Sequence, residues 1–182
     1  IDAVVLSHAH IDHCGNLPNL VRRGFQGPIY CTAATRDLIA VMLADSAKIQ
    51  EEDAYHLNQR RPNGEPPIEP LYSYRDVRRT MQQTRSIPYE VAQAIGNGVR
   101  ARFVEAGHLL GSAMVHLTID ADGRERSITF TGDLGRKDMP ILREPAPVPA
   151  ADLLISECTY GGRNHPGAEM LASDLGEVVK RT

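Results

Sequence analysis

Four side chains that bind divalent metal ions lie close together near the start of the chain: His8, His10, Asp12 and His13, directly after the apolar residues 3–6. In an extended segment, residues two apart point to the same side, so His8 and His10 can bind one ion together. Asp12 and His13 follow about one turn later and can face a second ion. Histidine is scarce here, with seven in the chain, so three in one short stretch indicate a metal site rather than a polar loop. Imidazole and carboxylate ligands suit zinc best, with manganese or iron as alternatives.

Two further candidate ligands stand in glycine-rich segments at the ends of predicted strands. His108 lies in residues 106–112 and Asp133 in residues 131–135; glycine lets the backbone approach an ion closely. Either residue alone would fit an ordinary turn, but a dinuclear centre needs more ligands than one loop provides. Two ions about 3.5–4 Å apart can share a hydroxide and bring its formation near neutral pH. The predicted arrangement has one ion on His8, His10 and His108, the other on Asp12 and His13, and Asp133 as the bridge.

The remaining acidic and histidine candidates give weaker signals. Glu157 ends a short apolar strand, where a carboxylate is costly unless it has a partner. It could cap the local loop or serve the catalytic site. His165 follows it in a glycine-rich stretch and is a candidate for substrate binding. His116 alternates with apolar residues on a strand and is predicted to face solvent, and His56 lies on a polar helical stretch and is predicted to be on the surface.

The bulk composition fits one globular domain. The chain has 182 residues, 42% of them hydrophobic, and a formal net charge of −3, which gives no electrostatic reason to expect or exclude a polyanionic partner. Cys14, Cys31 and Cys158 are widely spaced and odd in number, which favours a reducing compartment, and we expect a cytoplasmic protein. Cys14 is predicted to be a buried thiol rather than a ligand. No apolar run is long enough to cross a bilayer, so no membrane partner is expected.

Hydrophobic periodicity predicts the order of elements. Thr32 is a suitable N-cap for a long helix from Ala33 to about Arg60, and a proline-rich loop follows it. The chain starts without methionine and ends inside a helical pattern, as expected for a piece of a longer protein. Strands are predicted at 1–6, 28–31, 89–94, 99–104, 113–119, 127–131 and 152–155 (the first and the last of them buried), and further helices near 17–23, 74–83 and 168–181. This order is typical of an α/β (α+β) layered fold, with sheets packed together and covered by helices.

The stretch His8-Ala9-His10-Ile11-Asp12-His13 resembles the HxHxDH signature of the metallo-β-lactamase superfamily, with His108 and Asp133 as its third and fourth motifs. Residues 156–161 resemble the acidic motif that opens the β-CASP branch, which includes ribonuclease J and the endonuclease subunit of the cleavage and polyadenylation specificity factor. The resemblance implies a four-layer αββα metallo-β-lactamase fold, incomplete at both ends. It also implies a partial metallo-β-lactamase domain at 1–155, without its N-terminal strands, and the start of a truncated β-CASP domain at 156–182.

The resemblance also implies an activity, which is hydrolysis of RNA phosphodiester bonds by attack of a zinc-bound hydroxide, with two zinc ions. Asp12 and Glu157 are the expected catalytic residues, with Glu157 orienting a histidine from further along the chain. Arg136 and Lys137 are candidate phosphate contacts, beside His165. RNA is the expected partner, with assembly into a homodimer or an RNA-processing complex.

Two other functions remain open. A hydrolase of a small thioester or lactone fits the first metal motif equally well, but the Glu157 stretch and the long helical insertion at 33–83 argue against it. A non-catalytic scaffold subunit of an RNA-processing complex is also conceivable, although the chain keeps every ligand that this region should contain.

Overall fold

A small parallel sheet carries the first metal-binding motif. It consists of β1 (Val4–Val5), β2 (Ile29–Cys31) and β3 (Thr84–Ser86), in that order. The structure is a computed structural model that describes residues 1–62, 64–163 and 171–181. Of the strand predicted at 1–6, only Val4 and Val5 are assigned to a strand, and they pair with Ile29 and Tyr30, the first two residues of β2. The predicted burial of this strand is wrong at its start, because Ile1 precedes the pairing and is 86% exposed, while Val4 and Val5 are half-buried.

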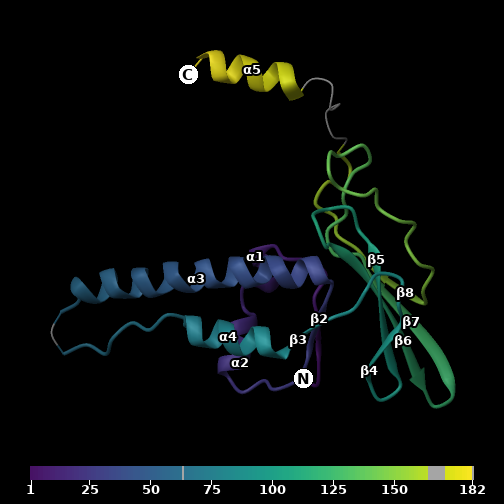
Figure 1. The fold of residues 1–182 in the computed structure, drawn as a ribbon, viewed down its shortest axis with the longest axis horizontal. Helices are drawn as coiled ribbons and strands as arrows, with labels where there is room; N and C mark the ends of the chain where they lie inside the picture. The colour runs from purple at the N-terminus through teal and green to yellow at the C-terminus, as the bar shows by residue number, and fades with distance from the viewer. Residues whose placement is uncertain (63, 164–170, 182) are drawn as a thin grey trace.

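Helices cover one face of this sheet (Figure 1). They are α1 (Ile11–Cys14), α2 (Leu17–Arg22), α3 (Ala33–Gln59) and α4 (Tyr74–Gln83). As the sequence predicts, Thr32 caps α3, its side chain accepting a hydrogen bond from the Thr35 amide. The apolar side of these helices packs on the sheet in one core that includes Ile29, Ile39, Leu43, Tyr72 and Val77. Helices α3 and α4 both begin and end close to their predicted limits.

A second sheet packs against the other face of the first. Its strands are β4 (Gln93–Gly96), β5 (Val99–Glu105), β6 (Ala113–Ala121), β7 (Arg124–Phe130) and β8 (Leu153–Ile155), in sequence order. The first four pair antiparallel, and β8 pairs parallel to β7. The strand predicted at 89–94 begins only at Gln93, because Glu90 adopts a positive φ of 61° that interrupts the extended chain.

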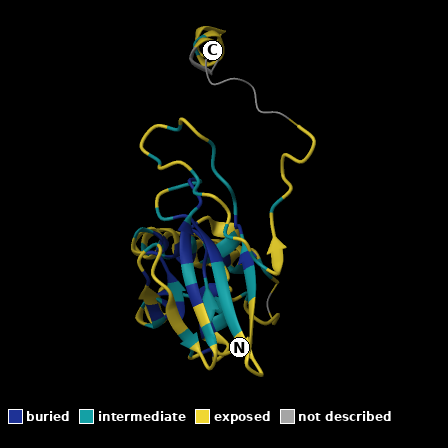
Figure 2. Cartoon of the chain, turned by 90° about the vertical axis from the view of Figure 1, so that its right-hand side faces the viewer, coloured by how far each residue is buried: buried dark blue, intermediate teal, exposed yellow. Residues whose placement is uncertain are grey.

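The prediction of a buried strand at 152–155 is wrong in one respect. The strand exists as β8, but Leu153, Leu154 and Ile155 are 52%, 53% and 47% exposed. Figure 2 shows the chain coloured by burial, with exposed parts in yellow. The apolar run predicted burial, yet β8 lies at the edge of its sheet. Within the described part of the chain, only β7 pairs with it, so three apolar side chains remain in contact with solvent.

Alternate side chains of β5 and β6 point to opposite faces of the second sheet and belong to two different hydrophobic cores. Phe103 and Val115 face the first sheet and pack with Val5 and Tyr30. Val104 and Met114 face the opposite way, where Leu134 and Ala146 cover them. The layers are therefore helices, first sheet, second sheet and, over part of the far face, the irregular segment that contains residues 134–146.

The closing helix is α5 (Leu171–Arg181); residues 168–170 of the predicted helix lie outside the described residues. None of the described helices combines the length and the apolar character needed to cross a membrane.

Candidate metal centre

The predicted ligands come from both sheets and meet at one end of them. His8 and His10 follow β1 of the first sheet, His108 lies in the loop between β5 and β6, and Asp133 follows β7. The backbone joins the two sheets at this point, because the Ala113 amide donates a hydrogen bond of 2.8 Å to the Ser7 carbonyl. This bond holds the segment that leads into His8 against the end of the loop that carries His108.

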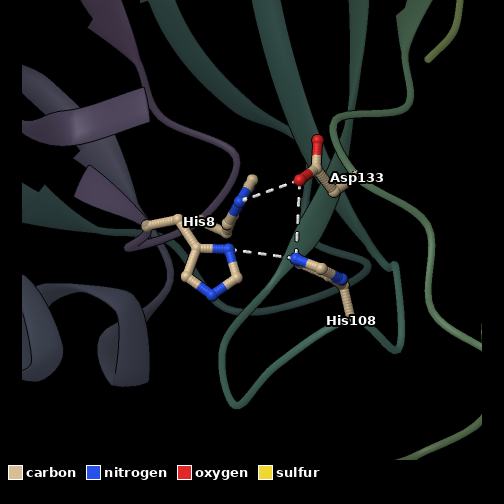
Figure 3. Close-up of side chains that lie close together, drawn as sticks. His8, His108 and Asp133 are labelled. Atoms are coloured by element: carbon tan, nitrogen blue, oxygen red, sulfur yellow. Dashed lines mark hydrogen bonds and ion pairs between the residues drawn. The ribbon is translucent and has the colours of Figure 1, made fainter. Parts of the chain in front are cut away.

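Four of the predicted ligands form one cluster. One possible ligand atom from each of His8, His10, His108 and Asp133 lies within 4.8 Å of the others. Oδ2 of Asp133 is 3.6 Å from His8 Nε2 and 3.5 Å from His108 Nε2. His108 Nε2 is also 3.0 Å from His10 Nδ1. Figure 3 shows His8 and His108 turned toward the Asp133 carboxylate, an arrangement that fits one ion between them.

The state of His8 supports metal binding. Its Nε2 atom is buried and has no hydrogen-bond partner among the residues that the structure describes, and a bound metal ion would satisfy this otherwise costly polar atom. Burial, with the neighbouring His13 as the second cause, lowers the pKa of His8 to about 4. The imidazole is therefore neutral near pH 7 and offers a lone pair. Burial, followed by the charge of His10, also lowers the pKa of His108.

The remaining two ligands of the motif lie on the other side of Asp133. Its second oxygen, Oδ1, is 3.4 Å from His13 Nε2. Asp12 Oδ2 lies 3.6 Å from the same His13 nitrogen, and the Asp12 side chain is 74% exposed. The carboxylate of Asp133 thus has one oxygen near His8 and His108 and the other near His13, as a bridging ligand would.

Glycine is required where the second sheet meets the first motif. Gly132 has a φ of +56°, and a Cβ at this position would lie 2.9 Å from Ser7 Cβ. A Cβ at Gly135 would overlap the Gly107 carbonyl. The two glycines beside Asp133 therefore allow its segment to lie against both the Ser7–His8 segment and the His108 loop.

Glu157 lies beside the cluster and also accepts a hydrogen bond from the backbone of the loop that follows Asp133. Its Oε1 accepts a hydrogen bond of 2.6 Å from the Leu134 amide. This bond holds the pKa of Glu157 below its usual range, although partial burial acts in the opposite direction. A cleft of about 370 Å³ is lined by Glu157, His108, Asp133 and Arg136, among others. The cap interpretation and the functional one are therefore compatible, because the capped carboxylate borders the cleft.

The predicted substrate contacts are placed unequally. Arg136 lines the cleft, whereas Lys137 is exposed and does not line it; His165 lies outside the described residues. His56 is exposed, as predicted. The prediction that His116 faces solvent is confirmed only in part: the residue is half-buried, and Nδ1 lies 2.9 Å from Thr129 Oγ1, because strand β7 brings Thr129 opposite it.

The cysteines near the first motif are buried thiols, as predicted for Cys14. Its Sγ donates a hydrogen bond of 3.3 Å to the Ala9 carbonyl, and burial raises its pKa to about 11. All three cysteines are free. Sequence reasoning did not single out Ser7, whose Oγ is 3.1 Å from His8 Nδ1. The available signal was a hydroxyl residue directly before the first histidine.

Comparisons with known proteins identify the family of the chain. The family described as "Beta-lactamase superfamily domain" matches residues 1–181. Ribonuclease TTHA0252 of Thermus thermophilus is 34% identical over the whole chain, which spans 37% of that protein. Transcription termination factor FttA of Pyrococcus horikoshii is 40% identical over 168 residues, 90% of this chain and 23% of the relative.

Solved structures include the Rm3 metallo-beta-lactamase, which is 18% identical, with a TM-score of 0.41, over 76% of this chain and 45% of the other. The chain thus spans less than half the length of the two curated relatives. The family match nevertheless covers almost every residue, including all six predicted ligands. The chain therefore belongs to the metallo-β-lactamase superfamily, and to its β-CASP branch.

Proposed function

We propose that the chain supplies the metal centre of a zinc-dependent ribonuclease that hydrolyses RNA phosphodiester bonds. The observation that carries this proposal is the position of the Asp133 carboxylate. Oδ2 lies near His8 and His108 on one side, and Oδ1 lies near His13 on the other. A carboxylate with histidines at both oxygens is suited to hold two ions side by side.

The donor set favours zinc, because imidazole nitrogens outnumber carboxylate oxygens. His8, His10 and His108 would hold one ion, Asp12 and His13 the other, and Asp133 both. Two zinc ions bound there would make a water nucleophilic near neutral pH and polarise the phosphoryl oxygen.

The protein's own groups would position the RNA and transfer protons. Asp12 is exposed beside His13, so it can accept a proton and deliver it to the departing oxygen. The Leu134 amide holds Glu157 as an anion at the edge of the cleft, ready to orient a proton donor. Arg136 lines the same cleft and can bind a phosphate oxygen.

The relatives favour RNA over a small ester as substrate. One relative that matches the whole chain is named a ribonuclease, and others are named transcription termination factors. We extend the proposal to a metallo-β-lactamase domain at 1–155, a β-CASP region beginning at 156, and a homodimer or RNA-processing complex as the working assembly.

The test uses the full-length protein loaded with zinc. Internally labelled single-stranded RNA and a generic thioester are offered in parallel, with Asp133→Asn as the inactivating variant. Asp138→Asn is the matched control, because Asp138 is exposed and lies outside the cluster. We expect RNA cleavage in the wild type and in Asp138→Asn, and its loss in Asp133→Asn. Thioester turnover with intact RNA would instead identify a small-ester hydrolase, and turnover of neither would favour a scaffold.

A further inference from the structure

The loop that carries His108 is a compact turn held by its own hydrogen bonds. Ser112 Oγ accepts from the amides of His108 at 3.0 Å and Leu109 at 3.2 Å. The Ser112 amide in turn donates to the Leu109 carbonyl at 3.0 Å. Because Ser112 binds the first two residues of the turn, residues 108–112 form one unit, and the position of this unit determines where the His108 imidazole lies.

Two buried threonine hydroxyls bind this turn from outside. The Gly111 carbonyl accepts hydrogen bonds from Thr32 Oγ1 at 2.7 Å and from Thr35 Oγ1 at 2.8 Å. Both threonines are almost fully buried, at 2% and 0% exposure. Gly111 has a φ of +87°, and a Cβ there would lie 2.5 Å from the Thr35 amide nitrogen. The turn is therefore seated directly on the first turn of α3.

This contact joins the two halves of the metal centre. Thr32 directly follows β2, and β2 pairs with β1, which leads into His8 and His10. The His108 turn belongs to the second sheet, between β5 and β6. The threonine–Gly111 bonds thus connect the end of β2 in the first sheet to the turn that carries His108. In this arrangement His10 Nδ1 and His108 Nε2 are 3.0 Å apart.

Helix capping alone does not explain the pair. Thr32 caps α3 by accepting the Thr35 amide at 3.2 Å, and an N-cap needs only this acceptor. Thr35 lies inside the first turn, where its hydroxyl has no capping role, yet it is buried and donates to Gly111. A valine could fill the same volume, so the hydroxyl is the feature that needs an explanation.

We propose that Thr32 and Thr35 are positioning residues for the metal centre, which hold the His108 turn at ligating distance from His8 and His10. The inference rests on the metal centre of the proposed function and is independent of RNA as the substrate. Residues that orient ligands in this way typically change metal affinity 10- to 100-fold when they are altered.

The experiment compares Thr35→Val, Thr35→Ser and Thr80→Val in the full-length protein. Thr80 is the matched control, because it is equally buried and its hydroxyl donates to the Asp76 carbonyl at 2.9 Å, within α4. The readouts are cobalt affinity with its visible absorption spectrum, and hydrogen exchange of residues 106–112 in the metal-free protein. We expect Thr35→Val to bind cobalt about ten-fold more weakly, with an altered spectrum and faster exchange. Thr35→Ser, which keeps the hydroxyl, should retain wild-type affinity, as should Thr80→Val.

Equal cobalt affinity and equal exchange in Thr35→Val and Thr80→Val would overturn the positioning role. So would a loss of affinity in Thr35→Ser as large as that in Thr35→Val, because the methyl group would then be the important feature. A wild-type protein that binds no cobalt would overturn both this inference and the metal centre. One that binds cobalt and leaves RNA intact would overturn only the proposed function.

Discussion

Ser7 Oγ and His8 Nδ1 lie 3.1 Å apart in the interior of the protein. The opposite nitrogen of His8 is the buried one that lacks a hydrogen-bond partner among the described residues. When Nδ1–H donates to Ser7, the lone pair of Nε2 is free for a metal ion. Ser7 thus holds the ring of the deepest histidine in the cluster, and the tautomer with the proton on Nδ1 is the one that suits metal binding.

Ser7→Ala should weaken metal binding and leave the fold intact. The substitution removes only the oxygen that binds His8 Nδ1, and the Ser7 carbonyl still accepts the Ala113 amide. We expect zinc affinity to fall about 10- to 100-fold, measured by competition with a chromophoric chelator. Ser46→Ala is the control, because its hydroxyl bonds Tyr72 outside the cluster. Unchanged zinc affinity in Ser7→Ala would show that packing alone orients His8.

His13→Gln should remove one ion and leave the other. His13 faces Asp133 Oδ1, whereas the four-residue cluster uses the opposite side of that carboxylate. We expect the zinc content, measured by mass spectrometry of the native protein, to fall from about two ions to about one. His56→Gln, on the exposed surface of α3, should keep both. Loss of both ions, or of neither, in His13→Gln would contradict the two-sided arrangement.

Glu157→Gln should separate catalysis from metal binding. The amide oxygen can still accept the Leu134 N–H, but the negative charge at the cleft is lost. We expect the rate of RNA cleavage to fall about 100-fold, with the zinc content unchanged. Glu144→Gln, at an exposed position that does not line the cleft, serves as the control. A cleavage rate equal to that of Glu144→Gln would restrict Glu157 to capping the loop.

Asp76→Asn should lower stability in a pH-dependent way. Asp76 caps α4, accepting from the Ser73 amide at 3.0 Å and the Ser73 hydroxyl at 2.8 Å. Burial alone would raise the pKa of Asp76, but these bonds, together with Arg22 and Arg79, outweigh it and lower the pKa. A carboxyl pKa lowered by folding contributes stability that is complete above the unfolded value, near 4, and is lost as the pH falls through the folded value.

We therefore expect Asp76→Asn to reduce the free energy of unfolding by about 1 kcal/mol at pH 7, with a smaller difference at pH 3. Denaturant unfolding of the metal-free protein measures both values. Asp53→Asn, an exposed substitution on α3, should have little effect at either pH. A difference that is the same at pH 7 and pH 3 would show that the Asp76 charge is not what stabilises the cap.

Much of the local structure could be read from the sequence. The periods of apolar residues located α3, α4 and strands β5 to β7, because a helix or strand with one buried face must repeat its apolar residues at its own period. The same reasoning failed for the burial of β8 and described His116 only in part. An apolar run indicates that a strand favours burial, but β8 is exposed because it lies at the edge of its sheet. Likewise, Thr129 on the neighbouring strand decided the surroundings of His116.

The sequence by itself determined the candidate ligands, because histidine and aspartate at this density have few structural uses other than metal binding. The tertiary structure decided which atoms face one another. Oδ1 and Oδ2 of Asp133 point to different histidines only once β7 lies beside the loop after β1. Thr35 reaches Gly111 across 76 positions of the chain. Such contacts depend on how two sheets and a helix pack together, and no periodicity within a single segment encodes that packing.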